Sequence, residues 1–484
     1  MKLAELLRDV DTLEMHAPED LDISGLAYDS RAVTPGEAFV AIRGFESDGH
    51  KYIQQAAEKG AACVICEEKP AVDVPYVIVR DSRMALALGS RNFFGDPASR
   101  MKLIGVTGTN GKTTTTYLVK HMLELERGAK VGLIGTNGNM IGSEFLHTER
   151  TTPESFELQK LLREMADAGC THVVMEVSSH SLVLHRVAGL HLAVGIFTNL
   201  TQDHLDFHKT MENYAEAKSL MFDMCDKAVI NLDDEWSKFM LDHCSCPALT
   251  FSESEHGDLR AHDIELRSSG VSFTAEYAGE RERVELGIPG LFSVYNALGV
   301  IGTGLSLGLS LGECAHSLIS ARGVKGRVEV VPTDGDYTIL IDYAHTPDAL
   351  ENVLKSMRAV TKGRLVALFG CGGDRDRTKR PIMGRIAADN ADFVVVTSDN
   401  PRTEEPEAII ADIVAGMEGT TTPREVICDR PAAIEWAIEH HQPGDVIVLA
   451  GKGHEDYQIV GHTKHHMDER EIVADILEKR KRDR

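Results

Sequence analysis

The sequence contains no long run of apolar residues, although 43% of its 484 residues are hydrophobic. No stretch approaches the roughly 18 to 20 residues that a membrane-spanning helix needs. The first ten residues, MKLAELLRDV, have the pattern of an amphipathic helix with acidic side chains. They lack the uninterrupted apolar core of a signal peptide. We therefore expect a soluble protein that remains in the cytoplasm.

Positive charge is also scarce. The chain has 51 Lys and Arg against 75 Asp and Glu, which gives a formal net charge of −24 at pH 7. Nucleic acids and anionic membranes both favour basic surfaces, so neither is expected as a partner. An anionic small molecule remains compatible with this charge if cations are placed locally. The expected partners are small-molecule substrates, and we expect the chain to act as a monomer.

Cysteine pairs with the spacing of a zinc site are absent. The nine cysteines are scattered, and the close pairs are Cys63 with Cys66 and Cys244 with Cys246. Neither pair has a matching second pair or a nearby His at zinc-like spacing. Cys63 and Cys66 lie in an apolar, strand-like segment, where buried thiols in a reducing compartment are the expected state. No metal or disulfide is assigned to cysteine.

The length exceeds what one hydrophobic core usually holds, and three domains are the preferred division. Residues 1–98 mix short strands and helices. Residues 99–329 alternate strands and helices and then show strand-like alternation over 261–288 without helices between. Residues 330–484 alternate again. This pattern predicts α/β domains with mainly parallel sheets, an antiparallel extension of the central one and a smaller, doubly wound last domain.

Individual elements follow from the same pattern. Helices are predicted after Lys112, over 156–168 and around Asn296, and the charged end of the chain is predicted to be a solvated helix end. The predicted strands are 103–107, 131–134, 172–176, 193–199, 228–231, 338–341, 365–369, 393–397 and 446–449.

The most informative segment is LIGVTGTNGKTT at residues 103–114, a β-like run that breaks into a Gly/Thr-rich loop. Backbone N–H groups of such a loop and of the next helix form a concave anion site. Lys112 adds charge near the β- and γ-phosphates, and Thr113 offers a hydroxyl to Mg²⁺. Because Val106 occupies the place of the first glycine of the general pattern, the segment indicates a subgroup of phosphate loops. The predicted ATP-binding residues are Gly108, Thr109, Asn110, Gly111, Lys112, Thr113 and Thr114.

Polar residues follow two other strands of the central block. Glu176 closes the strand 172–176, and His204 lies just beyond the strand 193–199. Open α/β sheets place ligand sites at such strand ends. Taken singly, each is better explained as a structural polar residue, but their shared placement with Lys112 favours a role in holding Mg²⁺ or its water.

Seven short motifs occur in the order found in the Mur ligases, and the chain resembles this family from Asp29-Ser-Arg31 to Glu455. Coincidence over seven ordered motifs is negligible. The motifs are GTNGKTT at 108–114, EVSSH at 176–180, NLTQDH at 199–204, DYAHTP at 342–347, GCGGDR at 370–375, DNPR at 399–402 and GKGHE at 451–455.

The resemblance implies an N-terminal domain for the UDP end of the substrate, a central P-loop ATPase-like domain and a C-terminal Rossmann-like domain for the incoming amino acid. It implies an ADP-forming acid–amino-acid ligase that adds meso-diaminopimelate to UDP-N-acetylmuramoyl-L-alanyl-D-glutamate through an acyl phosphate. Such a reaction belongs to peptidoglycan precursor synthesis, and so to cell wall biogenesis, cell shape and cell division. The implied cofactors are Mg²⁺ and a carbamate on Lys218, with ATP as co-substrate.

The resemblance also assigns residues to each part of the site. The implied catalytic residues are Lys112, Glu176, His204 and Lys218, and the implied metal ligands are Thr113, Glu176, His204 and carbamylated Lys218. Asn296 and Arg327 match the adenine-side and phosphate-side positions. The UDP-substrate set is Tyr28, Ser30, Phe45, Glu46, Ser47, Thr151, Thr152, Ser178 and Arg186. The diaminopimelate set is Arg375, Asp399, Asn400, Pro401, Arg402, Gly451 and Glu455.

Some positions admit a second interpretation. Arg150 stands where an Asn can precede the Thr pair, and Leu184 stands where a Gln can lie two residues before Arg186. Taken by itself, Lys218 is predicted to be a solvated helix lysine. Arg402 favours diaminopimelate because a guanidinium pairs with a second carboxylate and repels the ammonium of lysine. The local alternative is that Arg402 caps a helix or pairs with a neighbouring glutamate, Glu404 or Glu405.

The sequence is compatible with alternative functions. The nearest are the same ligase using L-lysine and an amide ligase similar to folylpolyglutamate synthetase. The segments Asp29-Ser-Arg31 and Asp399-Asn-Pro-Arg402 oppose the second. A P-loop switch or kinase would hydrolyse or transfer phosphate without an amino acid. A dinucleotide binder is disfavoured because no strand end offers the full G-x-G-x-x-G with a ribose-binding acid downstream.

Overall fold

The computed structural model describes residues 1–44, 47–148, 150–254, 256–321 and 323–482. By its internal contacts the chain forms two compact units. The first comprises Met1–Leu259 with Gly299–Ser310, and the second comprises Arg260–Leu298 with Leu311–Arg484. The domain boundaries at 98 and 329 remain predictions. Among the helices in the described part of the chain, none combines the length and the apolar character needed to cross a bilayer.

The N-terminal part of the first unit is a five-stranded sheet with the order β1-β5-β4-β3-β2, in which only β1 runs antiparallel to its neighbour. Cys63 and Cys66 are buried in β4, as predicted. The amphipathic helix expected over the first ten residues is limited to one turn, because Asp9 takes a left-handed φ of 64°. The elements are α1 Leu3–Leu6, β1 Thr12–His16, β2 Leu26–Ala27, β3 Ala38–Val40, α2 Ile53–Glu58, β4 Cys63–Cys66, β5 Tyr76–Val79 and α3 Ser82–Phe93.

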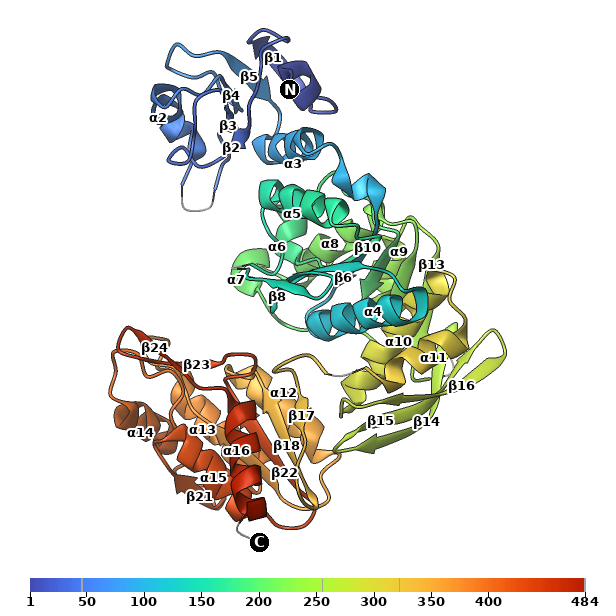
Figure 1. The fold of residues 1–484 in the computed structure, drawn as a ribbon, viewed down its shortest axis with the longest axis vertical. Helices are drawn as coiled ribbons and strands as arrows, with labels where there is room; N and C mark the ends of the chain where they lie inside the picture. The colour runs from blue at the N-terminus through green and yellow to red at the C-terminus, as the bar shows by residue number, and fades with distance from the viewer. Residues whose placement is uncertain (45–46, 149, 255, 322, 483–484) are drawn as a thin grey trace. The chain divides into compact units, whose positions relative to one another are not determined.

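The rest of the first unit is built on strands in the order β13-β12-β11-β6-β10-β7-β8-β9. The pairs from β13 to β7 are parallel, and β8 and β9 add antiparallel pairs. Apolar residues of α5 and α6 form one core with the strands, while α4 lies on the other face (Figure 1). The strands are β6 Lys102–Thr107, β7 Val131–Gly135, β8 Gly138–Ile141, β9 Glu144–Leu146, β10 His172–Glu176, β11 Val194–Phe197, β12 Ala228–Asn231 and β13 Ala248–Ser252. The helices are α4 Lys112–Arg127, α5 Ser155–Asp167, α6 Ser179–Val183, α7 Leu205–His208, α8 Met211–Ser219 and α9 Ser237–Asp242.

The second unit begins with the antiparallel strands that the sequence predicted over 261–288. They are β14 Leu259–Arg267, β15 Gly270–Tyr277 and β16 Glu280–Leu286, and β15 pairs antiparallel with β16 from Val271 to Tyr277. Two helices follow along the chain, α10 Leu291–Ser306 and α11 Leu311–Ile319, and the part of α10 from Gly299 onward belongs to the first unit. Asn296 is buried in α10, so the predicted helix around it is confirmed.

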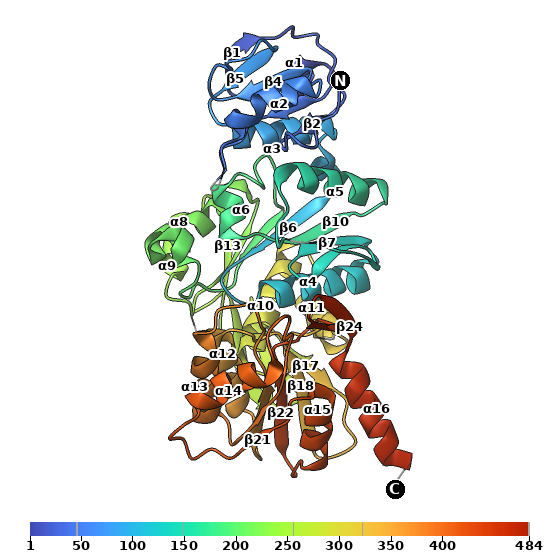
Figure 2. The ribbon, with the colours of Figure 1, turned by 90° about the vertical axis from the view of Figure 1, so that its left-hand side faces the viewer.

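The C-terminal sheet has the order β17-β18-β22-β19-β20-β21, and only β17 is antiparallel. One core forms with α12, α13 and α14, and another with α15 and α16, so helices cover both faces (Figure 2). The elements are β17 Glu329–Val331, β18 Tyr337–Asp342, α12 Pro347–Arg358, β19 Leu365–Phe369, α13 Lys379–Asn390, β20 Phe393–Val396, α14 Pro406–Gly416, β21 Arg424–Val426, α15 Arg430–Glu439, β22 Asp445–Ala450, β23 Tyr457–Val460, β24 Thr463–His466 and α16 Glu469–Arg482.

Candidate functional site

The loop between β6 and α4 is the centre of the site in the first unit. Gly108 and Gly111 have φ of 145° and 84°, a backbone region that side chains disfavour. The ammonium of Lys112 donates to the carbonyl oxygens of Gly108 at 2.9 Å and Thr109 at 2.8 Å. The cation is therefore held over the loop, at the N-terminus of a sixteen-residue helix that favours anions.

The end of β11 supports this loop. Thr198 Oγ1 donates to the carbonyl of Asn110 at 2.7 Å, and Asn199 accepts from the Asn110 N–H at 2.9 Å. The predicted strand 193–199 therefore ends at Phe197, because the next two residues turn their side chains to the loop. The first residue of the motif at 199–204 thus helps to hold the phosphate loop in place.

We expect Gly108→Ala to lower ATP-dependent turnover by roughly tenfold, because a small displacement of a reacting group is costly. A Cβ at Gly108 would lie 1.9 Å from Thr198 Oγ1, so the loop has to move. Gly128→Ala is the matched control, since Gly128 also has positive φ but meets nothing within 4 Å. Steady-state kinetics with ATP varied, together with a thermal melt, separate the two variants. Equal kinetics in both would contradict the steric argument.

Glu176 connects the loop to the neighbouring strand β7. Its side chain is buried and accepts from Thr113 Oγ1 at 2.9 Å, the Thr136 N–H at 2.9 Å and Thr136 Oγ1 at 3.0 Å. These donors are neutral hydroxyl and amide groups, and together they fix the carboxylate beside the first turn of α4. Carboxylate and hydroxyl oxygens are ligands that Mg²⁺ accepts, so Glu176 and Thr113 are chemically suitable for a cation there.

Lys218 is buried in α8, with 1% of its surface exposed, so the prediction of a solvated helix lysine is wrong. Its Nζ donates to the carbonyl of Gly108 at 2.8 Å and lies 4.6 Å from the centre of the Tyr214 ring. Burial, aided by the nearby charge of Lys112, lowers the pKa of Lys218 well below its ordinary value. The local sequence gave no sign of this, because the burial depends on contact with Gly108, which lies far away in the chain.

His204 belongs to a group of rings beside the loop. It has a left-handed φ of 51° at the start of α7, and its ring centre is 4.9 Å from that of His180 and 6.2 Å from that of Tyr214. Burial lowers the pKa of the adjacent His208 to about 4. Among the described residues, no group of three or more His, Cys, Asp or Glu is arranged as a metal site. The metal set Thr113, Glu176, His204 and Lys218 therefore stays a proposal.

The threonine pair 151–152 joins the same network. Thr151 Oγ1 is 3.0 Å from Thr136 Oγ1, and Thr152 Oγ1 donates to the backbone carbonyl of Glu176 at 2.8 Å. Ser178, whose hydroxyl caps α6, lies 3.5 Å from Thr152 Oγ1. These residues therefore form one hydrogen-bonded chain that starts at Glu176.

Three arginine side chains lie close to these hydrogen-bonded residues. Arg150 Nη1 and Arg186 Nε each lie 2.9 Å from Glu154 Oε1, and Arg83 Nη1 lies 3.6 Å from Glu154 Oε2. Three guanidinium groups around one buried carboxylate leave an excess of positive charge. Leu184, the other position that departs from the family pattern, is the C-cap of α6.

A pocket of about 420 Å³ adjoins Glu154. At its rim, the Tyr28 hydroxyl donates to Glu157 at 2.9 Å. Ser30 is buried and bonded to Gln55, and Ser47 donates to the Tyr52 hydroxyl. Phe45 and Glu46 lie outside the described residues. The pocket is lined by Tyr28, Asn139, Leu146, His147, Thr148, Arg150, Pro153, Glu154, Glu157 and Leu161.

In the second unit, Asn400 is the hub of the loops that follow β20 and β22. Its Nδ2 donates to Glu455 at 2.9 Å, and its Oδ1 accepts from buried Lys452 at 3.0 Å. Gly451 has φ of 110°, and a Cβ there would lie 2.9 Å from Asp399 Oδ2. Four residues of the predicted diaminopimelate set thus lie together: Asp399, Asn400, Gly451 and Glu455.

Arg402 is aimed at the loop after β19. Its Nη1 donates to the carbonyl of Gly373 at 2.9 Å. Its backbone has φ of 52° and is held by the hairpin β23–β24, since its N–H donates to Ile459 and its carbonyl accepts from the Gly461 N–H at 2.7 Å. Glu404 accepts instead from buried Arg380, so the predicted alternative of a pair between Arg402 and Glu404 is wrong.

Three other predicted residues occupy different surroundings in the second unit. Arg375 is exposed and donates to the Asp374 carbonyl, and Pro401 is buried. The Arg327 guanidinium lies 5.4 Å from the centre of the Tyr343 ring.

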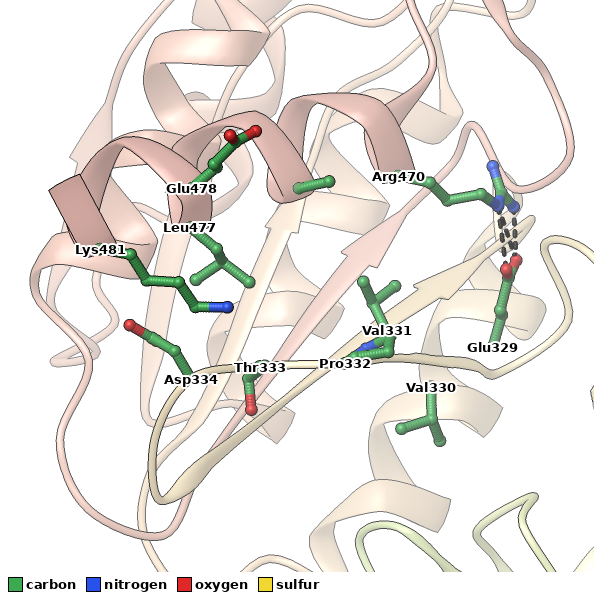
Figure 3. Close-up of a pocket in the computed structure, with 11 residues that line it drawn as sticks. Glu329, Val330, Val331, Pro332, Thr333, Asp334, Arg470, Leu477, Glu478 and Lys481 are labelled. Carbon is green, nitrogen blue, oxygen red and sulfur yellow. Dashed lines mark hydrogen bonds and ion pairs between the residues drawn. The ribbon is translucent and has the colours of Figure 1, made fainter.

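A further pocket of about 440 Å³ lies between β17 and α16 (Figure 3), and none of the predicted site residues lines it.

Sequence reasoning did not single out Thr136, Glu154 or Lys452. Thr136 directly follows β7, so the strand-end rule that found Glu176 could have found it as well. Lys452 lies inside a recognised motif, between two residues that were assigned. Glu154 gave no signal, because its three arginine neighbours come from separate segments of the chain.

Three family descriptions match the chain. Residues 22–109 match "Mur ligase family, catalytic domain", residues 106–304 match "Mur ligase middle domain", and residues 326–453 match "Mur ligase, glutamate ligase domain". The chain therefore belongs to the Mur ligase family. It is a ligase, and members of this family in general use ATP and Mg²⁺.

The chain is similar to relatives and to a solved structure that share one enzyme name. The chain is 46% identical to a UDP-N-acetylmuramoyl-L-alanyl-D-glutamate–2,6-diaminopimelate ligase of Clostridium tetani, over 99% of both chains. It is 47% identical to the protein of the same name from Caldanaerobacter subterraneus, again over 99% of both chains. A solved structure with that name superimposes with a TM-score of 0.77 at 33% identity, covering 99% of both chains.

Proposed function

We propose that the chain joins meso-diaminopimelate to UDP-N-acetylmuramoyl-L-alanyl-D-glutamate, with ATP cleaved to ADP and phosphate, in peptidoglycan precursor synthesis. The names of its relatives support this substrate set. The observation that carries the amino-acid assignment is Arg402, whose guanidinium contacts backbone carbonyls while the nearby Glu404 and Glu455 are bonded to other side chains. A guanidinium in this setting suits a distal carboxylate.

The reaction proceeds in two steps. A carboxylate oxygen of the UDP-linked substrate attacks the γ-phosphorus of ATP, and the bond to the ADP oxygen breaks, which gives an acyl phosphate. The neutral amine of the amino acid then attacks the acyl carbon, phosphate leaves, and the amine loses a proton. Lys112 and the loop N–H groups stabilise charge on the transferring phosphoryl group, mostly by position and electrostatics.

Oxygen ligands for Mg²⁺ are available beside the loop. Thr113, Glu176 and a carbamylated Lys218, with His204, would hold the cation, which neutralises phosphate charge when bound. The hydroxyl of Thr113 is already directed at Glu176, 2.9 Å away. Asn296 and Arg327 are proposed for the adenine and phosphate sides of ATP.

The UDP-linked substrate is proposed to bind along the first unit. The sugar–peptide part would contact Thr151, Thr152, Ser178 and Arg186, close to the phosphate loop through Glu176. The excess positive charge around Glu154 suits an anionic substrate of this kind. Tyr28, Ser30 and the turn containing Ser47 are proposed for the uridine nucleotide.

We expect Lys218 to be carbamylated, because its buried amine has a lowered pKa and a neutral amine adds to CO₂ with loss of a proton. The carbamate then supplies an anion where an ammonium would oppose a metal. Intact-protein mass under bicarbonate should increase by one CO₂, and peptide mapping should place the adduct on Lys218. Lys120 is the control, since it is also buried but is paired with Glu124. Crystallographic density for an unmodified Lys218 in the presence of nucleotide and Mg²⁺ would reject this assignment.

A phosphate-release assay tests the function directly. The enzyme is given ATP, Mg²⁺ and UDP-N-acetylmuramoyl-L-alanyl-D-glutamate, with meso-diaminopimelate or L-lysine in separate reactions. We expect phosphate release with diaminopimelate and little with lysine. Equal rates would favour the lysine-using alternative, and release without any amino acid would indicate a simple NTPase.

A further inference from the structure

A fully buried ion pair lies behind the loops of the second unit. Arg430 begins α15 and Glu469 begins α16, and both are 0% exposed. Arg430 Nε donates to Glu469 Oε1 at 2.8 Å. A buried ion pair costs desolvation and is weak evidence for stability, so its location calls for a further explanation.

The other two nitrogens of the guanidinium donate to the segment after β20 and to the last residue of β22. Arg430 Nη1 donates to the carbonyl of Ser398 at 3.2 Å, and Nη2 donates to the carbonyl of Ala450 at 2.9 Å. Ser398 immediately precedes Asp399, and Ala450 immediately precedes Gly451. One side chain therefore fixes the separation of the two loops that contribute Asp399 and Gly451.

The first turn of α16 also contacts the loop after β22, at Gly453. Arg470, next to Glu469, donates to the carbonyl of Gly453 at 2.9 Å. It also forms an ion pair with Glu329 of β17 (Figure 3). Because these contacts fix the start of α16, Glu469 is fixed as well, and it holds the Arg430 guanidinium in place.

We propose that Arg430, oriented by Glu469, is a positioning residue of the amino-acid site. It sets the spacing of the loops that carry Asp399, Asn400 and Gly451, and thereby the geometry offered to the distal end of diaminopimelate. The inference rests on the proposed function, because that function assigns these loops to the amino acid. A site has to be held to within a fraction of an ångström by the residues behind it.

The test compares Glu469→Gln and Arg430→Lys with a matched control, Arg364→Lys. Arg364 also pairs with a buried acid, Asp445, at 2.7 Å, but at the opposite ends of β19 and β22. We expect both test variants to raise KM for diaminopimelate by about three- to tenfold, with kcat and the KM for ATP and for the UDP substrate within about twofold. The control should lower the melting temperature without changing KM for diaminopimelate.

Several results would overturn the positioning role. These are an unchanged KM for diaminopimelate in both variants, an equal rise in all three KM values, or failure of both variants to fold where the control folds. The wild-type protein separates this inference from the proposed function. If wild-type enzyme releases no phosphate with diaminopimelate, the proposed function fails, whereas a working wild type with unaffected variants overturns the positioning role alone.

Discussion

Lys112→Ala should lose ATP-dependent activity by at least about two orders of magnitude while the fold stays intact. Removal of one group that stabilises transition-state charge typically costs on the order of 10²- to 10³-fold in kcat. The Lys112 ammonium donates to two carbonyls of its own loop, those of Gly108 and Thr109, so its removal takes away contacts that lie outside the strands of the sheet. Phosphate release under saturating substrates is the measurement.

The matched control for this prediction is Lys102→Ala. Lys102 is an exposed residue at the other end of β6, so its truncation removes a lysine from the same strand–loop–helix segment without touching the phosphate loop. Circular dichroism and a thermal melt confirm folding of both variants. Near-wild-type turnover of a folded Lys112→Ala protein would refute the assignment of this loop to the triphosphate.

Arg402→Ala should raise KM for meso-diaminopimelate by well over tenfold and leave KM for ATP nearly unchanged. Truncating one partner of a buried charged contact typically costs roughly 2 to 5 kcal/mol. Diaminopimelate differs from lysine by a carboxylate on the distal carbon, which a guanidinium receives through paired hydrogen bonds. Lysine lacks that carboxylate and brings its ammonium toward like charge. The wild-type enzyme should therefore discriminate against lysine, and the variant should lose most of that discrimination.

Arg385→Ala controls for loss of an arginine in the same sheet domain. Arg385 forms an exposed i,i+4 pair with Asp389 on α13, a kind of contact that contributes little. Steady-state kinetics with each amino acid varied provide the comparison. If Arg402→Ala leaves diaminopimelate kinetics unaffected, or wild-type enzyme uses L-lysine equally well, the amino-acid assignment is wrong although the ligase class stands.

The sequence predicted the buried central strands of the two sheets because their apolar runs are bounded by polar loop residues, but it did not predict β13, β17 or β21. It did not predict β8 and β9, which are only four and three residues long and partly exposed. It also ended β11 too late, since Thr198 and Asn199 have strand-like neighbours but bond to the phosphate loop. The periodicity of a sequence indicates which residues of one segment are buried. The strands β8 and β9 and the end of β11 depend on contacts with a second segment, which periodicity does not show.

The same distinction applies to the site. Lys112 and Glu176 were predictable because the local sequence around each, a phosphate loop and a strand end, indicates its chemistry. Lys218 was not, because its burial depends on α8 packing under Gly108, more than a hundred residues earlier in the chain. The cluster of arginines on Glu154 likewise exists only after α3, α5 and the segment after α6 come together.

The hairpin β23–β24 gives the backbone of Arg402 its unusual left-handed conformation, through Ile459 and Gly461. Most of its own side chains are exposed or half-buried, so selection on packing constrains them weakly. An insertion, deletion or altered turn there would re-aim the guanidinium while every residue of the amino-acid site stayed the same. A change in this hairpin would therefore alter the amino-acid preference of the enzyme without mutation of a binding residue.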